Sequence, residues 1–120
     1  YMKNFDNIFN VHYPLMRTSN FENGTMSVLP GSHKLGRLDY KKSRISDNSF
    51  TDLVPKAIDE ITSNFNEVFN FLELGDVVIF HKDLIHRSNH NSSELTRPVG
   101  IHRITTAYNI EFSQLSPDQL

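Results

Sequence analysis

Residues 77–109, VVIFHKDLIH RSNHNSSELT RPVGIHRITTAYN, have the composition of two strands joined by a polar loop. The segments 77–86 and 97–109 are rich in β-branched and apolar side chains, which are common in strands. The segment between them, 87–96, is rich in Asn and Ser, which disfavour a helix interior. We therefore predict a strand, a loop and a second strand in this part of the chain.

Three segments nearer the N-terminus also have strand patterns. They are NIFNVHYPLM (7–16), TMSVLPGSH (25–33) and NEVFNFLEL (66–74). Turns are predicted between them, at FENG (21–24) and at Gly75-Asp76. In the first strand, alternation places Ile8, Asn10 and His12 on one face and Phe9, Val11 and Tyr13 on the other.

A single helical insertion is predicted around 51–65. Leu53, Ala57, Ile58 and Ile61 recur there with helical spacing. Residues 34–50 before it are polar and irregular. Strands do not alternate with helices, so a parallel α/β sheet is excluded and a mainly β jelly roll is favoured.

Composition narrows the classes of protein. The 120 residues suffice for one domain, 1–120, and the formal net charge of −2 lacks the basic excess typical of nucleic-acid binders. The absence of cysteine excludes a disulfide scaffold, a thiolate zinc site and a cysteine nucleophile. No apolar run has membrane-spanning length, and no signal peptide is recognised. We therefore expect a cytoplasmic protein that binds neither nucleic acid nor membrane.

Histidines suggest a metal site in the first strand of the quoted segment. His81-Lys82-Asp83 has the His-x-Asp spacing of a non-haem iron centre, and His86 follows closely. In a regular strand, however, His86 points away from the face shared by His81 and Asp83. We therefore predict that these three side chains do not form one triad. His86 better suits the last ligand of a 2-His-1-carboxylate site whose first pair lies elsewhere.

Arg97 begins the second strand of the quoted segment. The hairpin would bring it close to His86. Arginine is well shaped to bind a carboxylate through two parallel hydrogen bonds. A metal enzyme with a dicarboxylate co-substrate needs this pair, although for Arg97 taken alone an exposed charge at a strand end is the favoured interpretation.

Two blocks together resemble the phytanoyl-CoA dioxygenase family. They are ENGTMSVLPGSHKLG (22–36) and LELGDVVIFHKDLIHRSNHNSSELTRPVGIHRITTAYN (72–109). Members of that family are Fe(II)- and 2-oxoglutarate-dependent oxygenases on a double-stranded β-helix. The resemblance implies that fold here, in partial and cupin-like form, as the C-terminal part of an oxygenase domain. It also implies hydroxylation of a small organic substrate.

The resemblance assigns roles to four residues. His86 is similar to the distal iron ligand, and Arg97 to the arginine that binds the far carboxylate of 2-oxoglutarate. Ser88 resembles the serine that helps to hold that carboxylate. Tyr13 stands where the family often has a tryptophan near the co-substrate. His33, in the PGSH motif, and His81 resemble positions that do not bind metal.

The wall of the site would be apolar. Phe80, Val99 and Ile101 are predicted to point inward and to protect the reaction, while ordinary core packing explains the same pattern.

The sequence departs from the family pattern at two places. Arg87 follows the distal histidine where the family commonly has Gly, which would narrow or charge the mouth of the pocket. No His-x-Asp pair precedes the strand at 7–16, and by spacing it would fall just ahead of Tyr1. The chain is therefore either a truncated oxygenase or a homologue without a complete metal site. Either way, we expect weak iron binding and little activity from these 120 residues alone.

Three functions from other classes remain open. The first is a non-catalytic jelly-roll module that binds a small ligand. The second is a zinc hydrolase-like site at His81, Asp83 and His86. The third is a scaffold or oligomerisation fragment, because an exposed sheet edge promotes pairing, and a homodimer would result.

Overall fold

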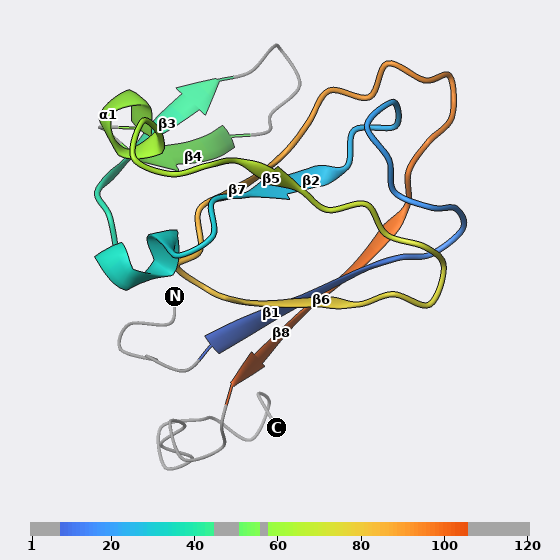
Figure 1. Ribbon diagram of the computed structural model, residues 1–120, viewed down its shortest axis with the longest axis horizontal. Coiled ribbons are helices and arrows are strands. Elements are labelled where there is room, and N and C mark those ends of the chain that lie inside the picture. Colours follow the sequence, from blue (N-terminus) through green and yellow to red (C-terminus); the bar gives the residue numbers. More distant parts are fainter. Residues whose placement is uncertain (1–7, 45–50, 56–57, 106–120) are drawn as a thin grey trace, which may run out of the picture.

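The computed structural model describes residues 8–44, 51–55 and 58–105, and these residues are mainly β, as predicted (Figure 1). The elements in chain order are β1 (Ile8–Pro14), β2 (Met26–Val28), the 3-10 helix η1 (Ser32–Leu35), β3 (Tyr40–Arg44), β4 (Thr51–Pro55), α1 (Ile58–Thr62), β5 (Val68–Phe69), β6 (Val78–His81), β7 (His86–Ser88) and β8 (Val99–Thr105).

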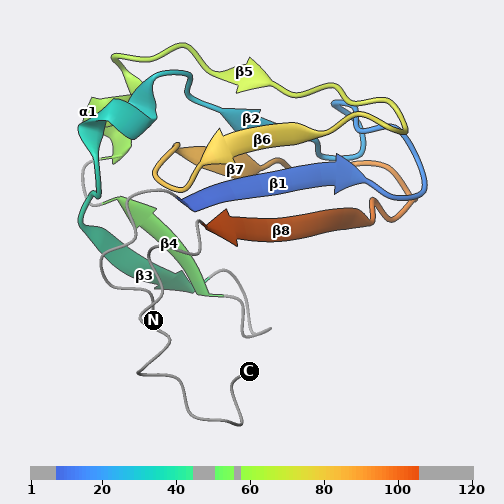
Figure 2. The ribbon, with the colours of Figure 1, turned by 90° about the horizontal axis from the view of Figure 1, so that it is seen from below.

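Two three-stranded antiparallel sheets make up most of the described structure. One has the strand order β6-β1-β8 and the other β5-β2-β7, while β3 and β4 pair as a separate hairpin. In the first sheet, His12 of β1 lies opposite Val78 of β6 and Ile101 of β8. Figure 1 shows the two sheets as separate layers, and Figure 2, in which they overlap, shows the β3–β4 hairpin at one end.

The core lies between these two sheets. Met26 and Val28 of β2 pack with Phe80 of β6, and the half-buried Val78 and Leu84 pack against this cluster. The inward side chains of β2 are therefore apolar. Ser27, between them, points to the opposite face, as strand alternation requires.

The chain passes from one sheet to the other between β6 and β7. Sequence patterning predicted one strand over 77–86, and this is wrong, because residues 82–84 form a turn closed by the Leu84 N–H and the His81 carbonyl, 3.0 Å apart. After the turn, β7 pairs with β2. The turn changes the direction of the chain. As a result, β7 lies in the β5-β2-β7 sheet and faces the β6-β1-β8 sheet.

Ser32 of the PGSH motif holds this crossover in place. Its side chain is fully buried, and its hydroxyl accepts a 2.9 Å hydrogen bond from the Ile85 N–H. The Ile85 carbonyl in turn accepts a hydrogen bond from the Leu29 N–H. Gly31 has φ +88°, in the left-handed region that glycine adopts without strain. The motif is a structural turn, as the sequence suggested.

The predicted helical insertion is wrong over its first part. Thr51–Pro55 form β4, paired with β3, and the helix is limited to Ile58–Thr62. β-Branched Thr51 and Val54 favour a strand, and Pro55 is unsuited to a helix interior. Residues 34–50 had no predicted strand, so the partner of β4 was missed. No helix in the described part of the chain is long and apolar enough to cross a bilayer.

Replacing Ser32 by alanine removes the only side-chain acceptor that the structure gives the Ile85 N–H. The Ser32→Ala variant should lose about 1–3 kcal/mol of unfolding free energy, because a buried backbone donor is left unpaired. Urea denaturation measures this loss. Ser92→Ala is the control, since the exposed Ser92 hydroxyl bonds only the Glu22 carbonyl, and it should change stability by less than about 0.5 kcal/mol. Equal stability of the two variants would contradict this role for Ser32.

Candidate functional site

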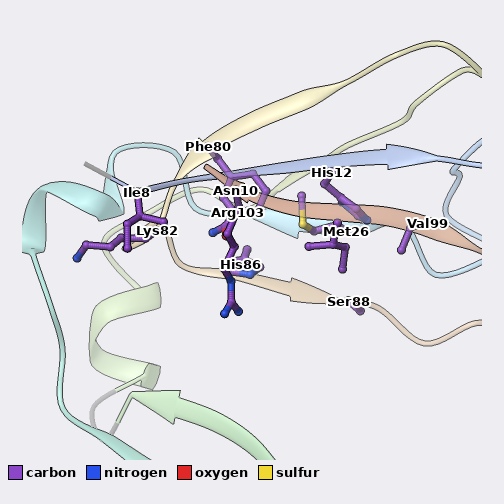
Figure 3. Close-up of a pocket in the computed structure, with 11 residues that line it drawn as sticks. Ile8, Asn10, His12, Met26, Phe80, Lys82, His86, Ser88, Val99 and Arg103 are labelled. Atoms are coloured by element: carbon purple, nitrogen blue, oxygen red, sulfur yellow. The ribbon is translucent and has the colours of Figure 1, made fainter. Parts of the chain in front are cut away.

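A cavity of about 720 Å³ lies between the two sheets. This volume is within the range of small-molecule sites. Its wall is built from alternate, inward-facing positions of five strands, together with Lys82 at the crossover (Figure 3). The lining residues are Ile8, Asn10, His12, Met26, Phe80, Lys82, His86, Ser88, Val99, Ile101 and Arg103. The predicted wall residues Phe80, Val99 and Ile101 are all among them.

His86 faces the cavity from the first position of β7. Its Nδ1 lies 2.7 Å from the Leu84 carbonyl oxygen, which can only accept a hydrogen bond, so Nδ1 carries the proton. In the neutral ring this leaves the lone pair on Nε2. The centroids of the Phe80 ring and the His86 imidazole are 4.9 Å apart, and this packing limits rotation of the imidazole. His86 is therefore held in the tautomer that can bind a metal through Nε2.

Ser88 lines the same cavity two residues further along β7. Alternation places both side chains on one face of the strand. The structure thus brings together His86 and Ser88, two of the predicted site residues.

Arg97 lies just before β8, and its guanidinium is partly paired. Its Nε donates a 3.0 Å hydrogen bond to the Asn23 carbonyl. Its Nη1 is buried and has no hydrogen-bond partner, and no carboxylate pairs with the group in the described part of the chain. Burial lowers the pKa of this guanidinium from its ordinary value. A buried cation without an anion is rare, because desolvation is costly unless the charge is paired.

The predicted turn at FENG positions Arg97. Asn23 is buried, and its Nδ2 donates to the Thr18 carbonyl. Gly24 has φ +74°, and a Cβ there would lie 2.5 Å from the Asn89 carbonyl oxygen. Only glycine fits between these backbones. The close approach holds the turn against the loop that leads to Arg97.

Sequence patterning did not identify His12 as a site residue. It is 5% exposed and lines the cavity from β1, and its Nδ1 is buried without a hydrogen-bond partner. Burial, and then the positive charges of Arg97 and His86, lower the pKa of His12. His12 and His86 line the same cavity. The strand alternation of β1, which separates His12 from Tyr13, was the available signal.

His81 and Asp83 lie outside the cavity. The Asp83 carboxylate is 2.7 Å from Lys82 Nζ, and the His81 ring packs near the rings of Phe9 and His33. His81 Nδ1 accepts a hydrogen bond from the Asp83 N–H. Within residues 8–44, 51–55 and 58–105, no three His, Cys, Asp or Glu side chains are grouped closely enough to hold a metal ion.

Tyr13 lies on the other face of β1 from His12. Its ring crosses Gly100 and stacks on His102 at 5.7 Å, and its hydroxyl is 2.9 Å from His102 Nε2. The structure therefore places Tyr13 apart from His86 and Ser88, and the site proposed below does not include it.

Arg87 also points away from the cavity. It forms two hydrogen bonds to the Glu67 carboxylate, at 2.8 and 2.9 Å, on the outer face of the β5-β2-β7 sheet. The Ser27 hydroxyl, which also donates to this carboxylate, and then Arg87 lower the pKa of Glu67, against an opposing effect of burial. The expectation that Arg87 charges the mouth of this cavity is thus wrong, since its charge is paired elsewhere.

The structure is that of a mainly β protein with a ligand-sized cavity between two sheets. The imidazole of His86 lies on the wall of this cavity. The half-buried Arg97, whose Nη1 has no hydrogen-bond partner, lines a separate pocket. The family model of phytanoyl-CoA dioxygenase (PhyH) matches residues 8–99, and the chain belongs to this family. No curated protein matches the chain.

Membership of the family implies Fe(II) and 2-oxoglutarate. The described residues fit a dicarboxylate better than they fit an iron ion. The orphaned Nη1 of Arg97 fits the carboxylate of a dicarboxylic acid. His86 fits one position on a metal ion. The other ligands of a 2-His-1-carboxylate centre are not grouped with it among the described residues. These residues alone do not make a complete iron site.

The tautomer of His86 can be tested directly. In the metal-free chain, at a pH where the ring is neutral, we expect the proton on Nδ1. Long-range ¹H–¹⁵N spectra of histidine-labelled protein distinguish the two ring nitrogens. His90, an exposed residue without a described ring contact, is the internal reference. A His86 ring protonated on Nε2 would contradict the arrangement.

Proposed function

We propose that this chain carries the co-substrate end of an Fe(II)- and 2-oxoglutarate-dependent dioxygenase that hydroxylates a small organic substrate. The observation that carries the proposal is the buried Nη1 of Arg97, which has no hydrogen-bond partner. Arg97 lines a separate pocket with Asn23 and Asn89, whereas His86 and Ser88 line the cavity between the sheets. Membership of the PhyH family supports the proposal. We further propose that the two sheets are parts of a double-stranded β-helix.

Arg97 would bind the distal carboxylate of 2-oxoglutarate. Its Nε is already taken by the Asn23 carbonyl, so Nη1 and the rest of the guanidinium remain for the ligand. A carboxylate would supply the missing acceptor and the missing negative charge in one group. The Ser88 hydroxyl would donate a second hydrogen bond to the same carboxylate.

His86 would supply one protein ligand to the metal through Nε2. When bound, Fe(II) would supply the oxygen activation that couples oxidative decarboxylation of 2-oxoglutarate to hydroxylation. The only His-x-Asp in the sequence is His81-Lys82-Asp83, whose side chains lie outside the cavity. We therefore propose that the remaining ligands come from a His-x-Asp pair outside these 120 residues.

The apolar wall would exclude water from the reacting groups. Phe80, Met26 and Val99 line the cavity between the sheets, and the cavity opens along β8, where Ile101 is 64% exposed. A substrate would approach from this side. These apolar side chains favour an organic substrate with a hydrocarbon portion.

Replacing Arg97 tests the carboxylate site. We expect the Arg97→Gln variant to bind 2-oxoglutarate at least about tenfold more weakly, because a charge-assisted hydrogen bond is lost. Isothermal titration calorimetry on the metal-free chain measures the affinity.

Arg103→Gln is the matched control for this experiment. Arg103 lines the same cavity from β8 but is exposed. It should lose much less affinity than Arg97→Gln. A larger loss in Arg103→Gln, or unchanged binding in Arg97→Gln, would contradict the assignment.

The affinity for Fe(II) distinguishes a chain that supplies one metal ligand from a protein with a complete iron site. We expect the chain alone to hold Fe(II) weakly under anaerobic conditions, because one imidazole is a poor site for this metal. Competition with a chelator measures the affinity. Near-stoichiometric retention of Fe(II), lost in His86→Ala, would contradict the proposed division of ligands. A longer chain that includes the His-x-Asp pair should form succinate from 2-oxoglutarate.

A further inference from the structure

Among the described residues, four buried side-chain nitrogen atoms have no hydrogen-bond partner, in Arg17, Asn70, His12 and Arg97. Two of them, Nδ1 of His12 and Nη1 of Arg97, belong to residues of the cavity wall and of the proposed co-substrate site. Most buried polar atoms in proteins are hydrogen-bonded, so each such atom calls for an explanation. One ligand that accepts hydrogen bonds from both side chains would account for the pair.

His12 lies on the wall of the cavity between the two sheets. It faces the cavity from the centre of β1, with Asn10 one inward position away (Figure 3). His86 and Ser88 line the same cavity from β7.

The chemistry of the ring favours a hydrogen-bond donor. Burial favours the neutral imidazole, which retains one N–H group. A carboxylate accepts a hydrogen bond from such a group. In the described structure, Nδ1 of His12 has no acceptor.

We propose that His12 is a third binding residue for the distal carboxylate of the dicarboxylate co-substrate, alongside Arg97 and Ser88. This inference rests on the proposed function. It adds to the site a side chain that neither the spacing of the motifs nor the family resemblance assigned.

Glutarate is the probe, because it keeps both carboxylates and lacks the keto group that would chelate a metal. We expect the metal-free chain to bind it, and His12→Phe to bind it about tenfold more weakly. Phenylalanine keeps the ring volume and removes both nitrogens. His12→Gln, which restores a donor near the position of Nε2 or Nδ1, should recover part of the affinity.

Asn10→Ala is the control variant, since Asn10 lines the same cavity and is given no role. It should bind glutarate as the unaltered chain does. A loss equal to that of His12→Phe would show a general disturbance of the wall, and would overturn the assignment.

A measurement on the unaltered chain removes any dependence on the folding of a variant. The ring ¹⁵N resonances of His12, assigned by their absence from the His12→Phe or His12→Gln spectrum, should shift on addition of glutarate. The resonances of exposed His90 should not. Unchanged His12 resonances at saturating glutarate would overturn the inference.

The two proposals fail in different ways. If Arg97→Gln abolishes glutarate binding while His12→Phe leaves it intact, His12 has no role and the proposed function stands. If Arg97→Gln binds as tightly as the unaltered chain, or if the unaltered chain does not bind glutarate, the carboxylate site is wrong. The inference about His12 then falls with it.

Discussion

The hydrogen bond from the Ile85 N–H to the buried Ser32 hydroxyl is the contact on which the site depends. At this point the chain leaves the β6-β1-β8 sheet and enters β7 of the other sheet. Without a fixed crossover, β7 would have no defined register on β2. The same contact therefore sets both the packing of the two layers and the direction of His86.

The first of the two sequence blocks that carry the family resemblance, residues 22–36, acts in this way twice, by supporting residues far away in the chain. Pro30-Gly31-Ser32 holds the approach to His86, and Asn23 accepts the hydrogen bond from Arg97 Nε. Neither turn supplies a ligand. Loop residues that bond backbone groups can position a site as firmly as the strands that carry it.

Strand existence could be predicted from the sequence, because alternation and β-branched composition are local signals. The same alternation separated the two faces of β1 without showing which one points inward, and Val99 and Ile101 of β8 line the cavity as predicted. Strand pairing between distant segments is not local. β4 was mistaken for helix because its partner β3 lies in a polar stretch without an apolar pattern.

The candidate site was predictable in part for the same reason. The family resemblance pointed to His86, Ser88 and Arg97, and the structure places the first two on one wall. The break at residues 82–84 could not be predicted, since it depends on Ser32 from a distant turn. His12 was missed because its significance comes from burial without a partner, which only the packed structure reveals.

A crystal structure of the chain with 2-oxoglutarate tests the central claim most directly. The account predicts one carboxylate within hydrogen-bond distance of the Arg97 guanidinium and the Ser88 hydroxyl, with the keto acid end directed at His86 Nε2. Density for the ligand against Arg103, or outside the cavity between the two sheets, would contradict it.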